Sequence, residues 1–123
     1  MALILVVEDE NYVQIFIREA LEDAGHEVAL ARSGKEASLL CRERDFDLII
    51  TDILMPEMDG LELIRSLHRS HSQLPPILAI SGAYEGALKI AERFGAAGIL
   101  KKPFGPDELF ATVDKILRKE EQR

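Results

Sequence analysis

The stretch that decides the fold covers residues 48 to 60 and reads LIITDILMPEMDG. Its first residues are apolar and mostly β-branched, which is typical of a strand buried on both faces of a parallel sheet. The run ends at Asp52, and Pro56 and Gly60 then mark a turn. Asp52 is therefore predicted at the carboxyl edge of the sheet, where ligands bind in such folds. An Asp that only ends a strand and starts a turn fits equally well, so this stretch alone leaves both interpretations open.

Length and composition limit the class of protein. The chain has 123 residues, 47% of them hydrophobic and 30% charged, which fits one domain over residues 1–123 with no output domain. The apolar runs are too short to cross a membrane, and the start lacks the basic segment of a signal peptide. Cys41 is the only cysteine, in agreement with a reducing compartment, so we expect a cytoplasmic protein. A net charge of −7 argues against direct nucleic-acid binding.

Strand-like and helix-like segments alternate along the whole chain. Strands are expected at residues 3–7, 27–31, 47–51, 77–80 and 99–100. Helices are expected at residues 12–24, 34–44, 60–69, 84–94 and 106–118. Asn11, Ser33 and Asp59 are the predicted N-caps, and Gly25 is the predicted end of the first helix. Five such units predict an α/β fold, a (βα)5 doubly wound three-layer sandwich with a five-stranded parallel sheet.

The first helix has more apolar residues than one buried face needs. Its predicted core face consists of Val13, Ile17, Ala20, Leu21 and Ala24. Outside that face lie Tyr12, Ile15 and Phe16. These three residues could dock a partner helix, although scattered exposed apolar residues are also ordinary.

Polar residues stand at the end of four of the predicted strands. In chain order they are Glu8 and Asp9, Asp52, Ser81 and Lys102. Taken singly, each has an ordinary surface role, but their joint occurrence at one sheet edge predicts a site. Three neighbouring carboxylates repel one another unless a cation is present, and hard oxygen ligands favour Mg²⁺ over Zn²⁺. With Mg²⁺ bound, Asp52 could act as a nucleophile toward a phosphoryl group.

The motifs together resemble a known family over nearly the full length. They are residues 6–10 (VVEDE), residues 52–56 (DILMP) with Asp59-Gly60, Ser81-Gly82, and Lys102-Pro103-Phe104. The chain resembles the receiver domain of bacterial two-component response regulators, whose CheY-like fold has strand order 2-1-3-4-5. The resemblance implies that Asp52 takes a phosphoryl group from a phosphohistidine on a sensor histidine kinase or a histidine phosphotransfer protein.

The resemblance also implies roles for the other site residues. Asp9 would bind Mg²⁺ directly and Glu8 through water, and Asp52 and the backbone carbonyl of Leu54 would complete the protein ligands. Lys102 would pair with the phosphoryl group and precede a cis peptide bond to Pro103. Ser81 would be the switch hydroxyl that moves toward the phosphoryl group.

One position departs from the family pattern. The family has an aromatic switch residue three positions before the site lysine, and here that residue is Ile99. A branched aliphatic side chain lacks the polar contacts of a swinging tyrosine, so we expect weaker coupling, or coupling through the backbone near residues 81–84. Leu54 and Ala83 offer no side chain to orient an attacking water, which favours a long-lived phosphoryl group.

Other interpretations concern the chemistry and the context. A dehalogenase-like phosphatase needs a second Asp where Leu54 stands, and a flavin phosphate would be repelled by residues 8–10. The chain could be a free-standing regulator, a module of a longer hybrid kinase or DNA-binding regulator, or a degenerate receiver that binds partners without phosphorylation. The family's output or homodimer surface corresponds to the fourth helix, the fifth strand and the last helix, including Ile99 and Lys101.

Overall fold

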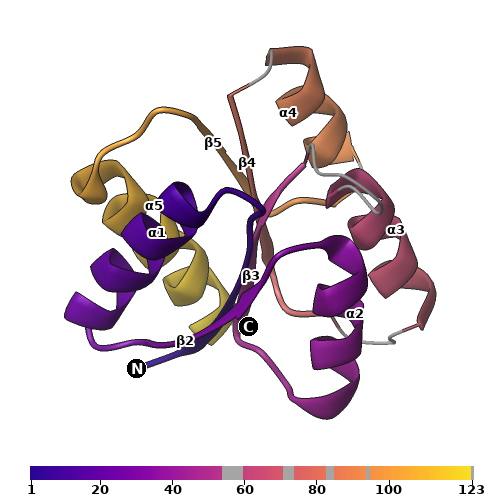
Figure 1. Cartoon of the computed structure of the whole chain (residues 1–123), viewed down its shortest axis with the longest axis horizontal. Coiled ribbons are helices and arrows are strands. Elements are labelled where there is room, and N and C mark those ends of the chain that lie inside the picture. The colour runs from indigo at the N-terminus through magenta and orange to yellow at the C-terminus, as the bar shows by residue number, and fades with distance from the viewer. Residues whose placement is uncertain (54–59, 71–73, 83–84, 94, 123) are drawn as a thin grey trace.

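The computed structural model describes residues 1–53, 60–70, 74–82, 85–93 and 95–122. Within them, strands and helices alternate from the first residue of β1 to the last of α5 (Figure 1). The strands are β1 (Leu3–Val7), β2 (Glu27–Ala31), β3 (Leu48–Asp52), β4 (Ile77–Ser81) and β5 (Gly98–Lys101). The helices are α1 (Asn11–Asp23), α2 (Gly34–Glu43), α3 (Gly60–Ser70), α4 (Glu85–Arg93) and α5 (Pro106–Glu121).

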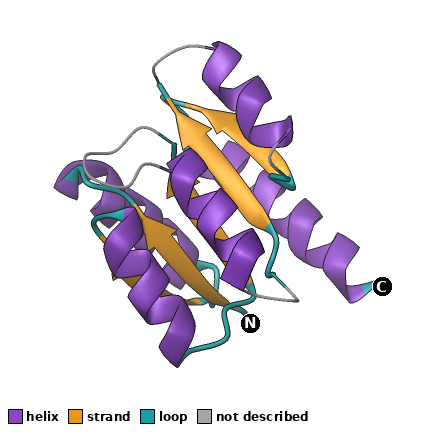
Figure 2. Cartoon of the chain, turned by 90° about the vertical axis from the view of Figure 1, so that its right-hand side faces the viewer, coloured by secondary structure: helices purple, strands orange, loops and turns teal. Residues whose placement is uncertain are grey.

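All five strands pair in parallel in the order β2-β1-β3-β4-β5, which confirms the predicted doubly wound sheet (Figure 2). β1 pairs with β2 on one side and β3 on the other, so the strand order reverses beside it. The register places Val7 opposite Thr51 and Asp52 opposite Ile80. The carboxyl ends of the neighbouring strands β1 and β3 therefore lie almost level, and the residues that follow them meet at one edge.

Helices cover both faces of the sheet. α1 and α5 lie on one side, and α2, α3 and α4 lie on the other (Figure 1). Alternate residues of β1 belong to different parts of the core: Ile4 and Val6 pack with α1 and α5, whereas Leu5 and Val7 pack with α2 and α3. This arrangement explains why the inner strands β3 and β4 read as continuous apolar runs, since each of their residues is buried whichever way it points.

Two helix-end predictions are confirmed. The Ser33 hydroxyl accepts a hydrogen bond from the Glu36 backbone amide at 3.2 Å and so caps α2. Gly25 follows α1 with φ +92°, in the left-handed region that ends many helices. The cap predicted at Asp59 lies outside the described residues.

Three details of the helices differ from prediction. Asn11 is the first residue of α1 and not its cap, because its side-chain oxygen accepts a hydrogen bond from Arg32. Ala24 is exposed, since the chain leaves the helix there toward Gly25. α5 continues to Glu121, past the predicted end at Arg118. The three added residues, Lys119, Glu120 and Glu121, are good helix formers.

β3 begins and ends one residue later than predicted. Its range of Leu48–Asp52 makes Asp52 the last residue of the strand. The carboxylate of Asp47 instead accepts a hydrogen bond from the Leu3 backbone amide at 2.8 Å, at the opposite edge of the sheet. The shift leaves Asp52 at the carboxyl edge, as expected.

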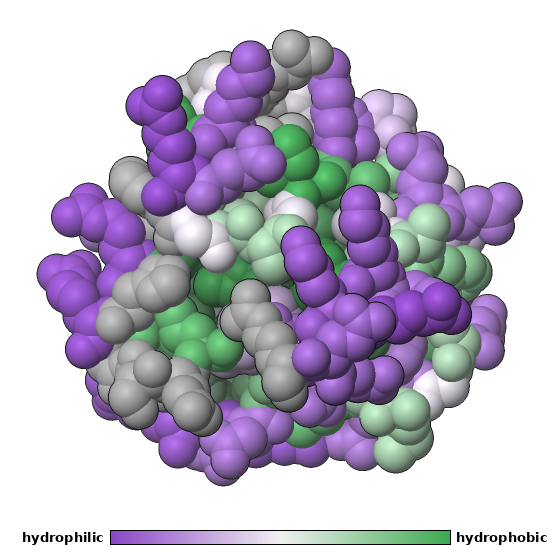
Figure 3. Space-filling model, turned by 180° about the vertical axis from the view of Figure 1, so that it is seen from behind, coloured by the Kyte–Doolittle hydropathy of each residue, from purple (hydrophilic) through white to green (hydrophobic). Residues whose placement is uncertain are grey.

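The face seen from behind is largely hydrophilic (Figure 3). Seen from behind, hydrophilic side chains stand along most of the outline, with smaller apolar areas between them (Figure 3). Among the exposed large hydrophobic residues of the described ranges, Tyr12 and Ile15 lie on α1 and Leu39 on α2. No helix within the described ranges is long and apolar enough to cross a membrane.

The positive φ of Gly25 predicts a specific cost of substitution. Gly25→Ala should lower the free energy of unfolding by about 1 kcal/mol, because a Cβ is strained in the left-handed region even where space is open. Gly25→Asn, the matched control, should cost less since Asn tolerates this conformation. Urea unfolding of both variants checks this, and equal stabilities for Ala and Asn would contradict it.

Candidate functional site

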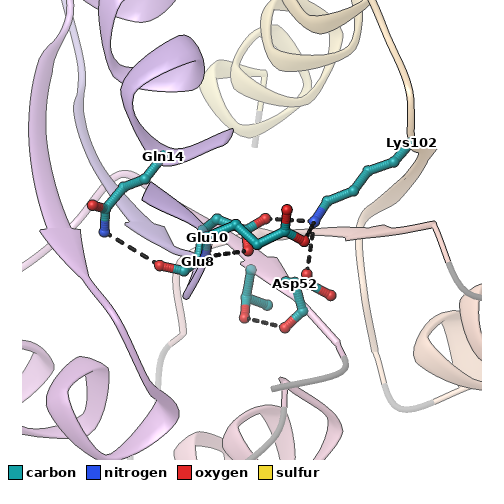
Figure 4. Close-up of polar contacts among 6 residues, drawn as sticks. Glu8, Glu10, Gln14, Asp52 and Lys102 are labelled. Atoms are coloured by element: carbon teal, nitrogen blue, oxygen red, sulfur yellow. Dashed lines mark hydrogen bonds and ion pairs between the residues drawn. The ribbon is translucent and has the colours of Figure 1, made fainter. Parts of the chain in front are cut away.

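The carboxyl ends of β1, β3 and β5 bring two carboxylates to one ammonium group. The Nζ atom of Lys102 lies 2.6 Å from Oε1 of Glu8 and 2.8 Å from Oδ2 of Asp52. A third carboxylate, that of Glu10, lies 3.8 Å away. Figure 4 shows the Lys102 side chain reaching across the edge of the sheet to these groups. The predicted meeting of Glu8, Asp52 and Lys102 is therefore observed.

The two closest contacts are sheltered from water. The Glu8 side chain is fully buried, and only 8% of the Asp52 side chain and 16% of the Lys102 side chain are exposed. Burial alone would lower the pKa of Lys102, but hydrogen bonds and charge attraction with Asp52 and Glu8 outweigh burial and raise it. Lys102 therefore stays positively charged throughout the physiological pH range.

Glu8 has an unusual pKa for a carboxylic acid. Burial is the largest cause and raises its pKa from 4.5 to about 7, and the neighbouring charge of Asp52 adds to this rise. The hydrogen bond from Lys102 opposes it but does not cancel it. Without a metal ion, Glu8 therefore keeps its proton up to a much higher pH than an ordinary glutamic acid does.

Asp9 completes an oxygen-rich cluster. Glu8, Asp9 and Asp52 each offer one carboxylate oxygen, and these atoms all lie within 4.8 Å of one another. When all three are ionised, they carry two more negative charges than the single ammonium group of Lys102 can offset. This donor set could bind a metal ion, and its all-oxygen chemistry and residual charge fit a hard divalent cation.

Comparison with known proteins identifies the family. The model of the response regulator receiver domain matches residues 4–114. The chain belongs to this family. A relative, the alkaline phosphatase synthesis transcriptional regulatory protein PhoP of Bacillus subtilis, is 32% identical over 96% of this chain and 49% of its own length. The sensor kinase CckA of Brucella abortus is 34% identical over 98% of this chain and 13% of its own length.

Solved structures agree with this assignment. The chemotaxis response regulator CheY4 of Vibrio cholerae is 33% identical, with a TM-score of 0.86 over 94% of this chain and 98% of its own. NtrX of Brucella abortus reaches a TM-score of 0.92 at 31% identity, over 98% of this chain and 28% of its own. This chain spans about half of PhoP and a small part of CckA, so receiver domains of this kind occur within larger regulators.

Ser81 also lies at the carboxyl edge of this receiver domain. It is the last residue of β4, is only 2% exposed, and its carbonyl accepts a hydrogen bond from the Lys102 backbone amide at 2.9 Å. A Cβ added to the next residue, Gly82, would lie 3.3 Å from Cβ of Lys102, so glycine permits this close approach. The Lys102-Pro103 peptide bond is cis, as predicted.

Other predicted positions are more distant or are not described. Leu54 and Ala83 lie outside the described residues. Ile99 is half-buried and packs beside Ile53, Ala79 and Ala91, on the face of the sheet that α4 covers.

Three polar residues at the carboxyl edge of the sheet were not predicted as site residues. Glu10 approaches Lys102, Gln14 is 7% exposed and donates to the backbone of Glu8, and Arg32 contacts the turn after β1. Gln14 could have been found, because it falls at an inward position of α1, three residues before Ile17. Arg32 follows β2 directly, so the strand-end rule that selected the other residues also applies to it.

The raised pKa of Glu8 predicts how stability depends on pH without metal. A carboxyl group whose folded pKa lies above its unfolded value stabilises the fold below the unfolded pKa, and this stability is lost as pH rises through the folded pKa. Relative to Glu8→Gln, the native chain in EDTA should therefore lose roughly 3 kcal/mol of unfolding free energy between pH 4.5 and pH 8. Urea unfolding measures this difference, and a pH-independent difference would contradict the prediction.

Proposed function

We propose that this receiver domain accepts a phosphoryl group on Asp52 from a phosphohistidine and signals through a changed partner-binding surface. The observation that supports this most strongly is the position of the Asp52 carboxylate, which ends a buried strand 2.8 Å from the Lys102 ammonium and within a carboxylate cluster. The proposed partner is a sensor histidine kinase or a histidine phosphotransfer protein.

The reaction is a direct transfer between two groups. A carboxylate oxygen of Asp52 attacks phosphorus, and an oxygen–phosphorus bond forms while the nitrogen–phosphorus bond of the phosphohistidine breaks. The electron pair of the broken bond stays on the imidazole. Lys102 neutralises charge on the phosphoryl oxygens, and the Ser81 hydroxyl, at the end of the neighbouring strand, donates a hydrogen bond to one of them.

The proposed metal is Mg²⁺, which Asp9 and Asp52, Glu8 through water, and the carbonyl of Leu54 would hold. When bound, it offsets the negative charge that gathers on the phosphoryl oxygens. Glu8 contributes its negative charge to the metal site only when it has lost its proton. The affinity for Mg²⁺ should therefore increase as the pH rises through the Glu8 pKa of about 7. The domain would thus assist its own phosphorylation and dephosphorylation and would not act on a separate substrate.

We also propose a cytoplasmic location, since a single cysteine fits a reducing compartment.

The first test is intact-protein mass after incubation with acetyl phosphate, with and without Mg²⁺. We expect one Mg²⁺-dependent phosphoryl adduct on the native chain and none on Asp52→Asn, because the amide cannot act as the nucleophile. Asp47→Asn is the matched control, since Asp47 is exposed and directly precedes β3, at the opposite edge of the sheet from Asp52. No adduct on the native chain, under conditions that label a known receiver, would favour the degenerate receiver that binds partners without phosphorylation.

The exposed part of α1 is the proposed docking surface for the phosphohistidine donor. Tyr12 is 86% exposed and Ile15 is 44% exposed, and both follow within two turns of helix after the acidic residues of the site. An apolar strip beside the acceptor would let a donor helix pack there while its histidine reaches Asp52.

We also propose a phosphorylation-dependent homodimer, in which two copies of the chain would pack together through α4, β5 and α5.

Docking and chemistry can be separated by a surface substitution. Ile15→Asp should slow phosphotransfer from the cognate phosphorylated kinase by about tenfold, which corresponds to about 1.4 kcal/mol, while labelling by acetyl phosphate stays unchanged. Leu39→Asp is the matched control, because Leu39 is 54% exposed on α2. The kinase is chosen from the source organism as the one that transfers fastest to the native chain. Equal slowing by both variants would contradict docking on α1.

A further inference from the structure

Arg32 lies at the carboxyl edge of the sheet, and the proposed function does not use it. It follows the last residue of β2, and its guanidinium group donates hydrogen bonds to the side-chain oxygen of Asn11 and, at 3.3 Å, to the backbone carbonyl of Asp9. Its own backbone amide donates to the Glu36 carboxylate at 3.0 Å. The side chain therefore links the turn after β2 to the turn after β1.

Gln14 contacts the same turn. Its Nε2 atom donates to the carbonyl of Glu8 at 3.3 Å (Figure 4). It also donates to the carbonyl of Ala31 at 3.4 Å. Two successive carbonyls, those of Glu8 and Asp9, thus each accept a hydrogen bond from a side chain. These carbonyls belong to the two planar peptide units on either side of the Asp9 Cα atom. Fixing both planes fixes the backbone dihedral angles of Asp9 and hence the direction of its Cα–Cβ bond, from which the carboxylate extends.

Asp9 needs such support more than the other carboxylates of the cluster. Glu8 and Asp52 are buried and contact Lys102, whereas Asp9 is only half-buried. Metal ligands usually rely on hydrogen-bonded groups behind them for correct orientation. We propose that Arg32 is a positioning residue that holds the Asp9 turn for divalent-cation binding. This inference rests on the proposed function, because it assumes that the carboxylate cluster binds Mg²⁺.

The charge of Arg32 allows a sharp test. If the guanidinium acted only through its positive charge, its removal would reduce repulsion of a cation and tighten Mg²⁺ binding. If it positions Asp9, its removal weakens Mg²⁺ binding despite the loss of that repulsion. The two explanations therefore predict opposite signs for the same substitution.

The experiment is calorimetric titration of Mg²⁺ into the native chain, Arg32→Ala, Arg32→Lys and the control Arg44→Ala. We expect Arg32→Ala to raise the dissociation constant for Mg²⁺ by about threefold to tenfold. Loss of a group that supports a metal ligand typically weakens metal binding by about tenfold to a hundredfold, so this effect lies at or below the lower end of that range. Arg32→Lys should lie between Arg32→Ala and the native chain, since it keeps the charge but lacks the planar fork. Arg44→Ala should match the native chain, because Arg44 is an exposed arginine that pairs with Glu27, at the opposite edge.

A second measurement separates positioning from loss of structure. The Mg²⁺ concentration for half-maximal labelling by acetyl phosphate should rise by the same factor in Arg32→Ala, while its rate at saturating Mg²⁺ stays within about twofold of native. Unchanged or tighter Mg²⁺ binding by Arg32→Ala would overturn the inference, as would an equal effect of Arg44→Ala. If the native chain itself bound no Mg²⁺, both this inference and the proposed metal site would fail, and the native titration alone would reveal it.

Discussion

The ammonium group of Lys102, held between the carboxylates of Glu8 and Asp52, is the interaction on which the carboxyl edge of the sheet depends. A carboxylate with no exposure to water is costly unless a partner compensates its charge. Glu8 has this partner only because β5 ends beside β4 and carries Lys102 across to β1 and β3. The same contact leaves Asp52 beside a positive charge, which suits the role proposed for it as the nucleophile in phosphoryl transfer.

The sheet explains why the polar chemistry gathers where it does. Both faces are covered by helices, so the strands have no solvated face on which to carry charged residues (Figure 1). Polar side chains can follow the strands only at their ends, and parallel pairing brings all carboxyl ends to one side. The acidic cluster is therefore a consequence of topology combined with a few strand-end residues.

Much of this arrangement could be predicted from the sequence. The apolar runs and glycine stops defined all five strands and helices within a few residues, and the strand-end rule selected Glu8, Asp52 and Lys102. Arg32 also follows a strand, β2, but it was not predicted as a site residue. Gln14 was missed because a polar residue on an apolar helix face has no visible partner until the fold brings the ends of β1 and β2 together.

Prediction failed where a distant side chain competes for a local role. Asn11 has the composition of an N-cap, yet its oxygen accepts a hydrogen bond from Arg32, and α1 begins at Asn11 without a side-chain cap. A similar case stands at the start of β3, where Asp47, predicted as the first strand residue, precedes the strand and accepts a hydrogen bond from the Leu3 backbone amide. Local patterns cannot reveal such choices, since the partner lies far away in the sequence.

The contact between Glu8 and Lys102 also bears on the order of folding. Its two partners come from the first and the last strand of the chain, so it forms only after the intervening segments have found their places. Until β5 docks, an ionised Glu8 has no ammonium partner, so its carboxyl group must stay in water or take up a proton before it is buried. Such long-range parallel pairings are formed slowly but make folding cooperative. The contact of Lys102 with the carboxylate cluster is therefore completed only when β5 is in place.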